Sequence, residues 1–247
     1  LPFGLDTPAK IYSLTFQRYM DRFGYTNEDF GHYTVVARDH AATNPAAWFY
    51  ERPITIEDHQ NSRWIVEPIL RLLDCCQESD GGVAMILTTP ERARDLPKPP
   101  VLVRAITDCQ LIHGHVMFNY YQDDLARFEE NYRAAERLYG LSGLRPEDMD
   151  VATLYENFSP IVFMQLEGFG FCKEGEARDF IREGHIRLDG TIPLNPHGGL
   201  LGEAYIHGVN NILEGVRQIR GEAANQIADA EHALVAGGRG GMILGKG

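Results

Sequence analysis

The sequence predicts an α/β fold in which helices cover the faces of β-sheets. Short apolar runs typical of buried strands alternate along the chain with stretches of helical periodicity. Glycine-rich or polar segments follow the strands of the second half, where the loops of such folds collect. The chain has 247 residues, of which 44% are hydrophobic, and this is ample for a buried core.

The first part of the chain predicts two helices followed by an irregular region. Residues 7–23 are expected to form the first helix, because Thr7 and Pro8 are typical of a helix start. Its apolar residues share roughly one side: Ile11, Leu14, Tyr19 and Phe23. A second helix is expected at about 27–43. Residues 44–69 are mixed and interrupted by prolines, which predicts a loop region with short elements.

A proline-rich joint then divides the chain. Residues 81–89 (GGVAMILTT) predict a buried strand, and residues 90–96 predict a short helix. Another strand is expected within 98–110, directly after the joint. We therefore predict one domain over residues 1–98 and a second over residues 99–247.

Helices and strands continue to alternate in the second half. Helical spacing is shown by Leu125, Phe128, Tyr132, Ala135 and Leu138. Residues 145–156 predict a turn and a strand that ends near Tyr155, residues 158–171 an apolar helix, and residues 175–184 a short helix. Residues 232–247 predict a strand, a glycine turn and a strand. The long helix that begins near residue 209 is expected to bury Val209, Ile212, Leu213, Val216 and Ile219.

Composition excludes several classes of function. Lys and Arg number 23 against 35 Asp and Glu, so the net charge is −12, and without a basic patch this repels nucleic acids. No apolar stretch reaches the roughly 18 residues that a membrane helix needs, and no signal-like leader is present. We therefore expect a cytoplasmic protein with neither nucleic-acid nor membrane partners.

Cysteine and histidine patterns predict neither disulfides nor a metal site. The chain has four cysteines: Cys75, Cys76, Cys109 and Cys172. Their spacing forms no CxxC pair and no disulfide framework, so we expect reduced thiols. The adjacent Cys75 and Cys76 are interpreted as small buried residues rather than as reactive groups. His113 and His115 form an H-x-H pair without acidic or cysteine neighbours, which argues against metal binding.

Three strand ends carry the residues that could perform chemistry. They are the segments 154–160 (LYENFSP), 195–208 (NPHGGLLGEAYIHG) and 236–241 (AGGRGG). In open α/β sheets such ends gather ligands, because loops and helix N-termini direct backbone N–H groups there. Gly198 and Gly199 permit a tight turn that would present Tyr205 and His207, although a plain turn with a packed Tyr fits equally well. The segment 236–241 could cradle an oxyanion or form a flexible hairpin.

The order of these three motifs resembles that of the thiolase superfamily. Residues 2–20, 71–93 and 195–223 are similar to its sterol-carrier or lipid-transfer branch. The resemblance implies a thiolase-like layered αβαβα fold, of which this chain would hold the C-terminal half and the end of the N-terminal domain. The first part of the N-terminal domain, with the nucleophilic cysteine, would precede Leu1.

The chain departs from the thiolase pattern at each chemical position. Aligning YENFS on the first motif places Tyr155 where thiolases have the Asn or His of an oxyanion site. Aligning Asn195 and the double glycine places Tyr205 on the catalytic His. The third motif places Val235 on the acid/base Cys, and valine transfers no proton. The pattern is similar to that of the steroid-degrading aldolases of this branch, with Tyr155 and Tyr205 as catalytic phenols.

The resemblance implies a retro-aldol cleavage of a β-hydroxyacyl-CoA steroid side chain. One tyrosine would accept the proton of the hydroxyl and the other would donate to the enolate, with the assignment left open. An unperturbed Tyr is ionised only about once in a thousand molecules at pH 7, a handicap of roughly 4 kcal/mol that nearby donors would have to reduce. The candidate supporting residues are His207, Asn157, His197, Gly237 and Gly238.

The resemblance also implies partners, and it leaves two alternatives. An acyl-CoA substrate, a homodimer and a small partner protein with an OB-fold and a zinc ribbon are expected, with no cofactor besides the CoA of the substrate. An acyl-CoA thiolase of the lipid-transfer type is the first alternative. A non-catalytic thiolase-fold subunit that binds acyl-CoA is the second, because lost catalytic residues are also typical of pseudoenzymes.

Overall fold

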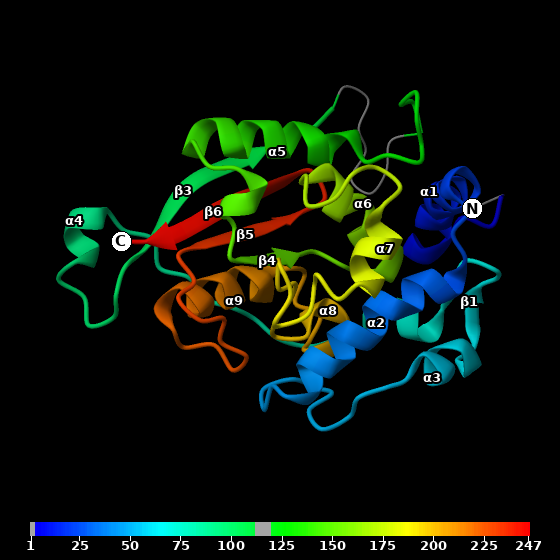
Figure 1. Cartoon of the computed structure of the whole chain (residues 1–247), viewed down its shortest axis with the longest axis horizontal. Coiled ribbons are helices and arrows are strands. Elements are labelled where there is room, and N and C mark those ends of the chain that lie inside the picture. Colours follow the sequence, from blue (N-terminus) through cyan, green and yellow to red (C-terminus); the bar gives the residue numbers. More distant parts are fainter. Residues whose placement is uncertain (1–2, 112–119) are drawn as a thin grey trace.

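The computed structural model describes residues 3–111 and 120–247, and its centre is a four-stranded mixed sheet. The strand order is β3 (Val101–Asp108), β6 (Gly240–Lys246), β5 (His232–Gly237) and β4 (Val151–Leu154). β4 pairs in parallel with β5, and the other two pairings are antiparallel. Figure 1 shows this sheet between helix α5 on one side and helix α9 on the other.

Side chains alternate between the two faces of the sheet, and a helix covers each face. Ala233 and Val235 of β5 belong to a cluster with Ile219 of α9 (Val209–Arg220). Leu234 and Ala236 belong to the larger core, which also contains apolar residues of α5 (Glu129–Ser142). This alternation is the period of two expected of strands. The predicted α/β fold with helix-covered sheets is therefore confirmed.

The two predicted N-terminal helices are confirmed as α1 (Pro8–Phe23) and α2 (Asn27–Ala42). The Thr7 side chain caps α1 by accepting a hydrogen bond from the Lys10 amide at 3.4 Å. α2 packs against three elements of the second half: α6 (Ser159–Gly168), α7 (Ala177–Arg182) and α8 (Gly199–Gly202). Six fully buried aromatic residues fill this core: Phe16, Tyr19, Phe30, Tyr33, Phe163 and Phe169. One core thus includes residues from both sides of the proline-rich joint, and the domain division at residue 98 stays a prediction.

Several shorter elements also follow the prediction. The region 44–69 is largely irregular, and the elements in and after it are α3 (Ile56–Asn61), β1 (Trp64–Val66), β2 (Leu70–Arg71) and the 3-10 turn Leu72–Asp74. Helix α4 (Pro90–Ala93) and the 3-10 turn Pro146–Asp148 complete the set. All four cysteines are free, as expected. Burial raises the pKa of both Cys75 and Cys76 to about 12, which favours inert thiols over reactive ones.

The predicted buried strand at residues 81–89 is wrong. The segment has no strand structure, and Ile86 and Leu87 are 92% and 86% exposed. In Figure 1 it leads to α4, which projects from the body of the molecule. A strand forms only where a neighbouring strand takes up its backbone hydrogen bonds, and no described strand lies beside this segment.

Two helical predictions also need correction. α5 begins at Glu129, so Leu125 and Phe128 precede it. In α9 only Ile219 of the five predicted apolar residues is buried, whereas Val209, Ile212, Leu213 and Val216 are half-buried. The buried side of α9 also carries polar side chains, namely Asn210, Asn211, Glu214 and Gln218. Asn211 has its hydrogen-bond partner on β4, where its Nδ2 donates to the Leu154 carbonyl at 3.0 Å.

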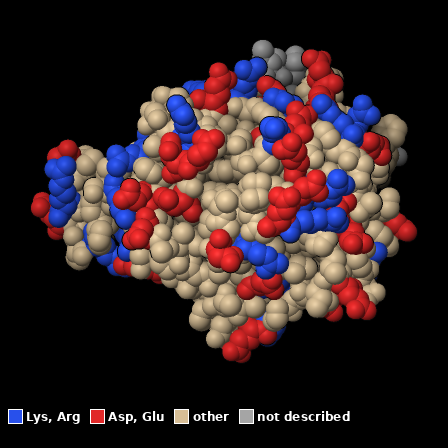
Figure 2. Space-filling model, viewed as in Figure 1, with Lys and Arg blue, Asp and Glu red and all other residues tan. Residues whose placement is uncertain are grey.

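The surface charge (Figure 2) and the helix lengths bear on the expected absence of nucleic-acid and membrane partners, which stays a prediction. Figure 2 shows acidic and basic side chains interspersed over the face in view. Within residues 3–111 and 120–247, no helix is both long and apolar enough to cross a bilayer. The same residues contain no group of three or more potential metal-ligating side chains. The His113 and His115 pair lies outside the described residues, and a cytoplasmic location stays a prediction.

Candidate functional site

Tyr155 is the first residue after the central strand β4. Its amide donates to the Ala236 carbonyl on β5 at 2.9 Å, which continues the parallel ladder by one residue. The side chain of the buried Gln165 donates to the Tyr155 carbonyl at 2.6 Å. A Cβ at Gly237 would overlap the Tyr155 Cβ, so a glycine is required where the neighbouring strand passes this side chain. Tyr155 is therefore fixed from three sides.

Tyr205 reaches the same place through the turn that begins at Asn195. The buried Asn195 side chain bonds both backbone groups of Leu154, accepting from the amide at 2.8 Å and donating to the carbonyl at 3.0 Å. Gly199 takes a φ of 64°, which favours glycine. The buried carboxyl of Glu156 then accepts a hydrogen bond from the Leu200 amide at 2.6 Å. These contacts tie the turn before Tyr205 to the segment that carries Tyr155.

The hydroxyl oxygens of Tyr155 and Tyr205 lie 2.7 Å apart and share a hydrogen bond. Their ring centroids are 6.2 Å apart and the ring planes are inclined by 61°. Both side chains are half-buried. The fold thus brings together two phenols that are 50 residues apart in the sequence.

Burial keeps both phenols protonated at neutral pH. It raises the pKa of Tyr155 well above the ordinary value of 10.0, and the hydrogen bond to Tyr205 raises it further. Burial also raises the pKa of Tyr205, while the hydrogen bond from Tyr155 acts in the opposite direction. Neighbouring donors were expected to reduce the cost of a tyrosinate, and the site does the reverse. The phenols of this site are therefore neutral at pH 7.

Of the predicted supporting residues, His207 lies beside the pair. Its ring centroid is 5.0 Å from that of Tyr205 and 6.3 Å from that of Tyr155. The side chain is exposed, and the backbone has a φ of 54°. Gly208 follows with a φ of 81°, and a Cβ there would lie 2.9 Å from the Tyr155 ring. His207 is thus held at the rim of the phenol pair.

The hydrogen bonds of His197 and Asn157 go to residues other than the two phenols, and Gly238 lies in a turn. The His197 ring is buried, and its Nε2 lies 3.3 Å from the side-chain oxygen of Asn211. The Asn157 carbonyl accepts from the Cys76 amide at 3.0 Å. Gly238 forms the hairpin turn between β5 and β6 with a φ of 57°. These residues shape the surrounding loops.

The structure adds neighbours that the sequence motifs did not indicate. The Ser79 hydroxyl accepts a hydrogen bond from the Tyr205 amide at 3.1 Å. The Cys76 thiol and the Tyr12 hydroxyl are close enough to raise the pKa of Tyr155 electrostatically. Tyr12 also packs against Phe158, with ring centroids 5.7 Å apart. Among these neighbours, the sequence had indicated only Cys76, as one of two adjacent cysteines that could be reactive.

Val235, at the position aligned with the thiolase acid/base cysteine, lies in an apolar cluster. It is 6% exposed and packs with Ile219 and Val151 on the α9 side of the sheet. A side chain without a titratable group in such surroundings neither accepts nor donates a proton.

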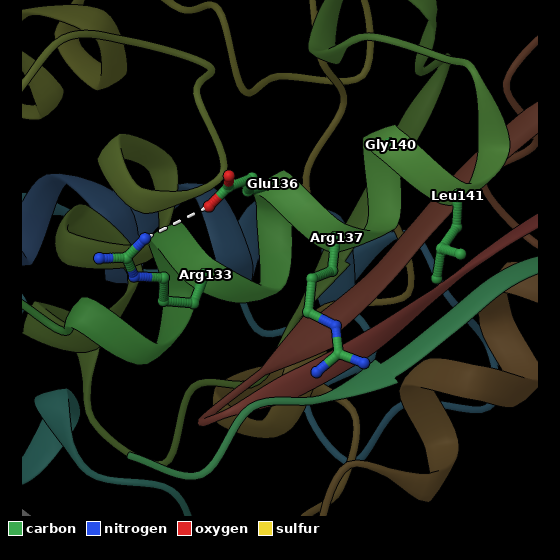
Figure 3. Close-up of a pocket in the computed structure, with 5 residues that line it drawn as sticks. All are labelled: Arg133, Glu136, Arg137, Gly140 and Leu141. Atoms are coloured by element: carbon green, nitrogen blue, oxygen red, sulfur yellow. Dashed lines mark hydrogen bonds and ion pairs between the residues drawn. The ribbon is translucent and has the colours of Figure 1, made fainter. Parts of the chain in front are cut away.

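A hollow lies elsewhere, along α5. It has a volume of about 430 Å³ and is lined by Arg133, Glu136, Arg137, Gly140 and Leu141. Figure 3 shows Arg133 paired with Glu136 and the side chains of Arg137 and Leu141 directed toward the sheet. None of the predicted site residues lines it.

We expect the turn before Tyr205 to loosen in acid because of His40. This buried imidazole lies 3.1 Å from the Leu194 carbonyl, and burial lowers its pKa from 6.5 to about 4. Between these values the unfolded chain binds a proton that the folded protein does not, so stability falls as pH drops. Relative to His40→Gln, the wild type should lose about 3 kcal/mol between pH 7 and pH 4. Urea unfolding across this range measures the difference, and parallel stability curves would contradict it.

Comparison with known proteins decides the family. Residues 113–246, more than half of the chain, match the family described as thiolase C-terminal domain-like. The chain belongs to this family. The resemblance seen in the sequence motifs is therefore confirmed, together with the thiolase-like fold.

Two curated relatives and a solved structure align with nearly the whole chain. A steroid side-chain-cleaving aldolase from Thermomonospora curvata is 53% identical, over 99% of this chain and 63% of that protein. A 17-hydroxy-3-oxo-4-pregnene-20-carboxyl-CoA lyase from Mycobacterium tuberculosis is 51% identical, over 99% and 64%. The structure of an Ltp2-ChsH2(DUF35) aldolase has a TM-score of 0.96 at 52% identity, over 99% and 65%. The chain therefore spans less than two thirds of each of these proteins.

Proposed function

We propose that this chain supplies the catalytic phenols of a carbon-carbon lyase that acts on a steroid acyl-CoA. The substrate is a 17-hydroxy steroid C22-CoA thioester, and retro-aldol cleavage gives a 17-keto steroid and propionyl-CoA. The observation that carries the proposal is the 2.7 Å hydrogen bond between Tyr155 and Tyr205, the residues at two chemical positions of the thiolase motifs. The names of the two relatives, an aldolase and a CoA lyase that are 53% and 51% identical, support it.

The reaction needs one proton to leave the β-hydroxyl and one to reach the thioester enolate. As the carbon-carbon bond breaks, its electron pair forms the enolate, and the hydroxyl-bearing carbon becomes the ketone. The phenol beside the hydroxyl accepts its proton and passes its own proton across the shared hydrogen bond to the second phenol. The second phenol protonates the enolate carbon. Both tyrosines end neutral, so the raised pKa values of Tyr155 and Tyr205 are compatible with turnover.

Thiolase chemistry fits these residues poorly. A thiolase needs an imidazole to activate its nucleophile and a second thiol to move a proton. The corresponding positions here are Tyr205 and Val235, and Val235 packs in an apolar cluster. A retro-aldol cleavage forms no acyl-enzyme and needs neither group.

The proposal extends to the assembly. We propose that the substrate is an acyl-CoA and that the reaction uses no cofactor, since CoA is part of the substrate. We also propose a homodimer that works with a small partner protein with an OB-fold and a zinc ribbon. The solved aldolase that aligns with this chain at 52% identity is named for two components, Ltp2 and ChsH2(DUF35), which supports a partner of this kind. Size measurement of the copurified complex tests the assembly.

Product analysis tests the reaction and the substrate together. The complete protein, purified with any subunit that accompanies it, is incubated with a panel of 17-hydroxy steroid side-chain CoA thioesters. Mass spectrometry should show equal amounts of 17-keto steroid and propionyl-CoA. Acyl transfer without ketone would point to a thiolase, and bound but unchanged thioester would point to a non-catalytic acyl-CoA-binding subunit.

A further inference from the structure

We infer that Ser79 is a positioning residue, which holds Tyr205 at the distance from Tyr155 that proton transfer requires. The inference rests on the proposed function, because it assigns Ser79 a part in the same reaction. Its basis is a short segment, Cys75–Gly81, that contacts both tyrosine-bearing loops. We refer to this segment as the strap.

The loop that carries Tyr205 needs support from outside. Residues 203–208 join α8 to α9 without helix or strand, and His207 and Gly208 both have positive φ values, of 54° and 81°. Tyr205 is half-buried, and its amide donates to the Ser79 hydroxyl at 3.1 Å. A buried amide without a partner costs free energy, so this hydroxyl stabilises the observed position of the loop.

The other end of the strap is attached to the loop that carries Tyr155. The Cys76 amide donates to the Asn157 carbonyl at 3.0 Å, and Cys75 forms an antiparallel bridge with Phe158. The strap therefore runs from a point two residues after Tyr155 to Tyr205 itself. Because both attachments are specific hydrogen bonds, the strap sets the spacing of the two loops.

A glycine lets the strap approach the Tyr205 loop closely. A Cβ at Gly81 would lie 2.5 Å from Cδ1 of Ile206, the residue after Tyr205. A Cβ at the adjacent Gly82 would meet nothing within 4 Å. Cδ1 is the end of a flexible side chain, so a single added methyl at Gly81 is met by a shift of that side chain, whereas a branched side chain there would press on the Tyr205 loop. Gly82 has open space and is the matched control.

Loss of this support should slow turnover more than it weakens binding. Proton transfer between the phenols depends on a hydroxyl separation of 2.7 Å, and small displacements of reacting groups have large effects on rate. Substrate binding uses a far larger surface. Ser79→Ala should therefore lower kcat by about tenfold and change KM by less than about twofold. Ser79→Thr keeps the hydroxyl and should restore kcat to within about threefold of the wild type.

The test measures kcat and KM of these variants in the complete protein with its accompanying subunit. Gly81→Val, whose branched side chain would press on Ile206, should lower kcat by about tenfold, whereas Gly82→Val should leave it unchanged. Ser142→Ala is the matched serine control, because its hydroxyl bonds the Leu138 carbonyl at 2.8 Å at the end of α5. It should leave kcat unchanged. The glycine pair carries the test if Ser79→Ala does not fold.

Failure of this inference is distinguishable from failure of the proposed function. If the wild type releases no ketone, the proposed function is wrong and the positioning role falls with it. If the wild type is active and Ser79→Ala and Gly81→Val retain its kcat, only the positioning role is wrong. Equal losses for Ser79→Ala and Ser79→Thr would likewise overturn it, because the hydroxyl would then be irrelevant.

Discussion

Replacing Tyr155 or Tyr205 by Phe is expected to lower kcat by about 10³-fold in each case. Phe preserves the ring and its packing but removes the hydroxyl. One of the two hydroxyl groups that carry the proton from the β-hydroxyl to the enolate is then missing. The 2.7 Å hydrogen bond that joins the phenols is lost in both variants. Ketone release from the CoA thioester, followed by mass spectrometry, measures the effect.

Tyr139→Phe is the matched control for these two variants. Tyr139 is also half-buried, and its hydroxyl donates to the Phe169 carbonyl at 2.9 Å, away from the phenol pair. Its loss should cost about 1 kcal/mol of stability and leave kcat near that of the wild type. A similar fall in kcat for all three variants would show a general loss of structure. Wild-type rates in both site variants would rule the phenols out as catalysts.

Gly199→Ala is expected to destabilise the protein by about 4 kcal/mol or more. An added Cβ would overlap the carboxyl of the buried Glu156, and the φ of 64° already disfavours a side chain at this position. Glu156 has little room to move, because it is fully buried and accepts a hydrogen bond from Leu200. Urea unfolding measures the change in the free energy of unfolding.

Gly143→Ala separates backbone strain from the overlap. Gly143 ends α5 with a φ of 73°, and a Cβ there would meet nothing within 4 Å. This control should cost only about 1 kcal/mol. Equal costs at the two glycines would mean that the contact between Gly199 and Glu156 does not hold the turn before Tyr205.

Local sequence patterns correctly predicted the elements that neighbouring residues in the sequence are enough to specify. Thr7 and Pro8 mark the start of α1, and the apolar run after Phe158 marks α6, so both helices were found within a few residues. The predicted strand at residues 81–89 was wrong. Its apolar pattern is typical of a buried strand, but a strand forms only beside a partner strand elsewhere in the chain. The prediction of an apolar buried side for α9 was wrong for a similar reason. Its buried Asn211 finds hydrogen-bond partners on β4, which the local pattern does not show.

The sequence motifs indicated the two phenols, His207 and Gly237, which the fold places together, but not the other neighbours of the pair. The motif alignment singled out Tyr155 and Tyr205, but no local rule gives a separation of 2.7 Å between residues 50 positions apart. His197 was expected among the supporting donors, and the fold instead buries it beside Asn211. Ser79 had no motif of its own. It matters only because folding brings the strap alongside the Tyr205 loop.

The central claim is that the two phenols act as one proton-transferring unit, and a double-variant cycle tests it most directly. The cycle compares kcat of the wild type, Tyr155→Phe, Tyr205→Phe and the double variant, with ketone release as the readout. Groups that act as a unit are strongly non-additive. We expect the double variant to fall by the same factor as each single variant, about 10³-fold. A loss equal to the product of the two single losses would show independent roles and contradict the account.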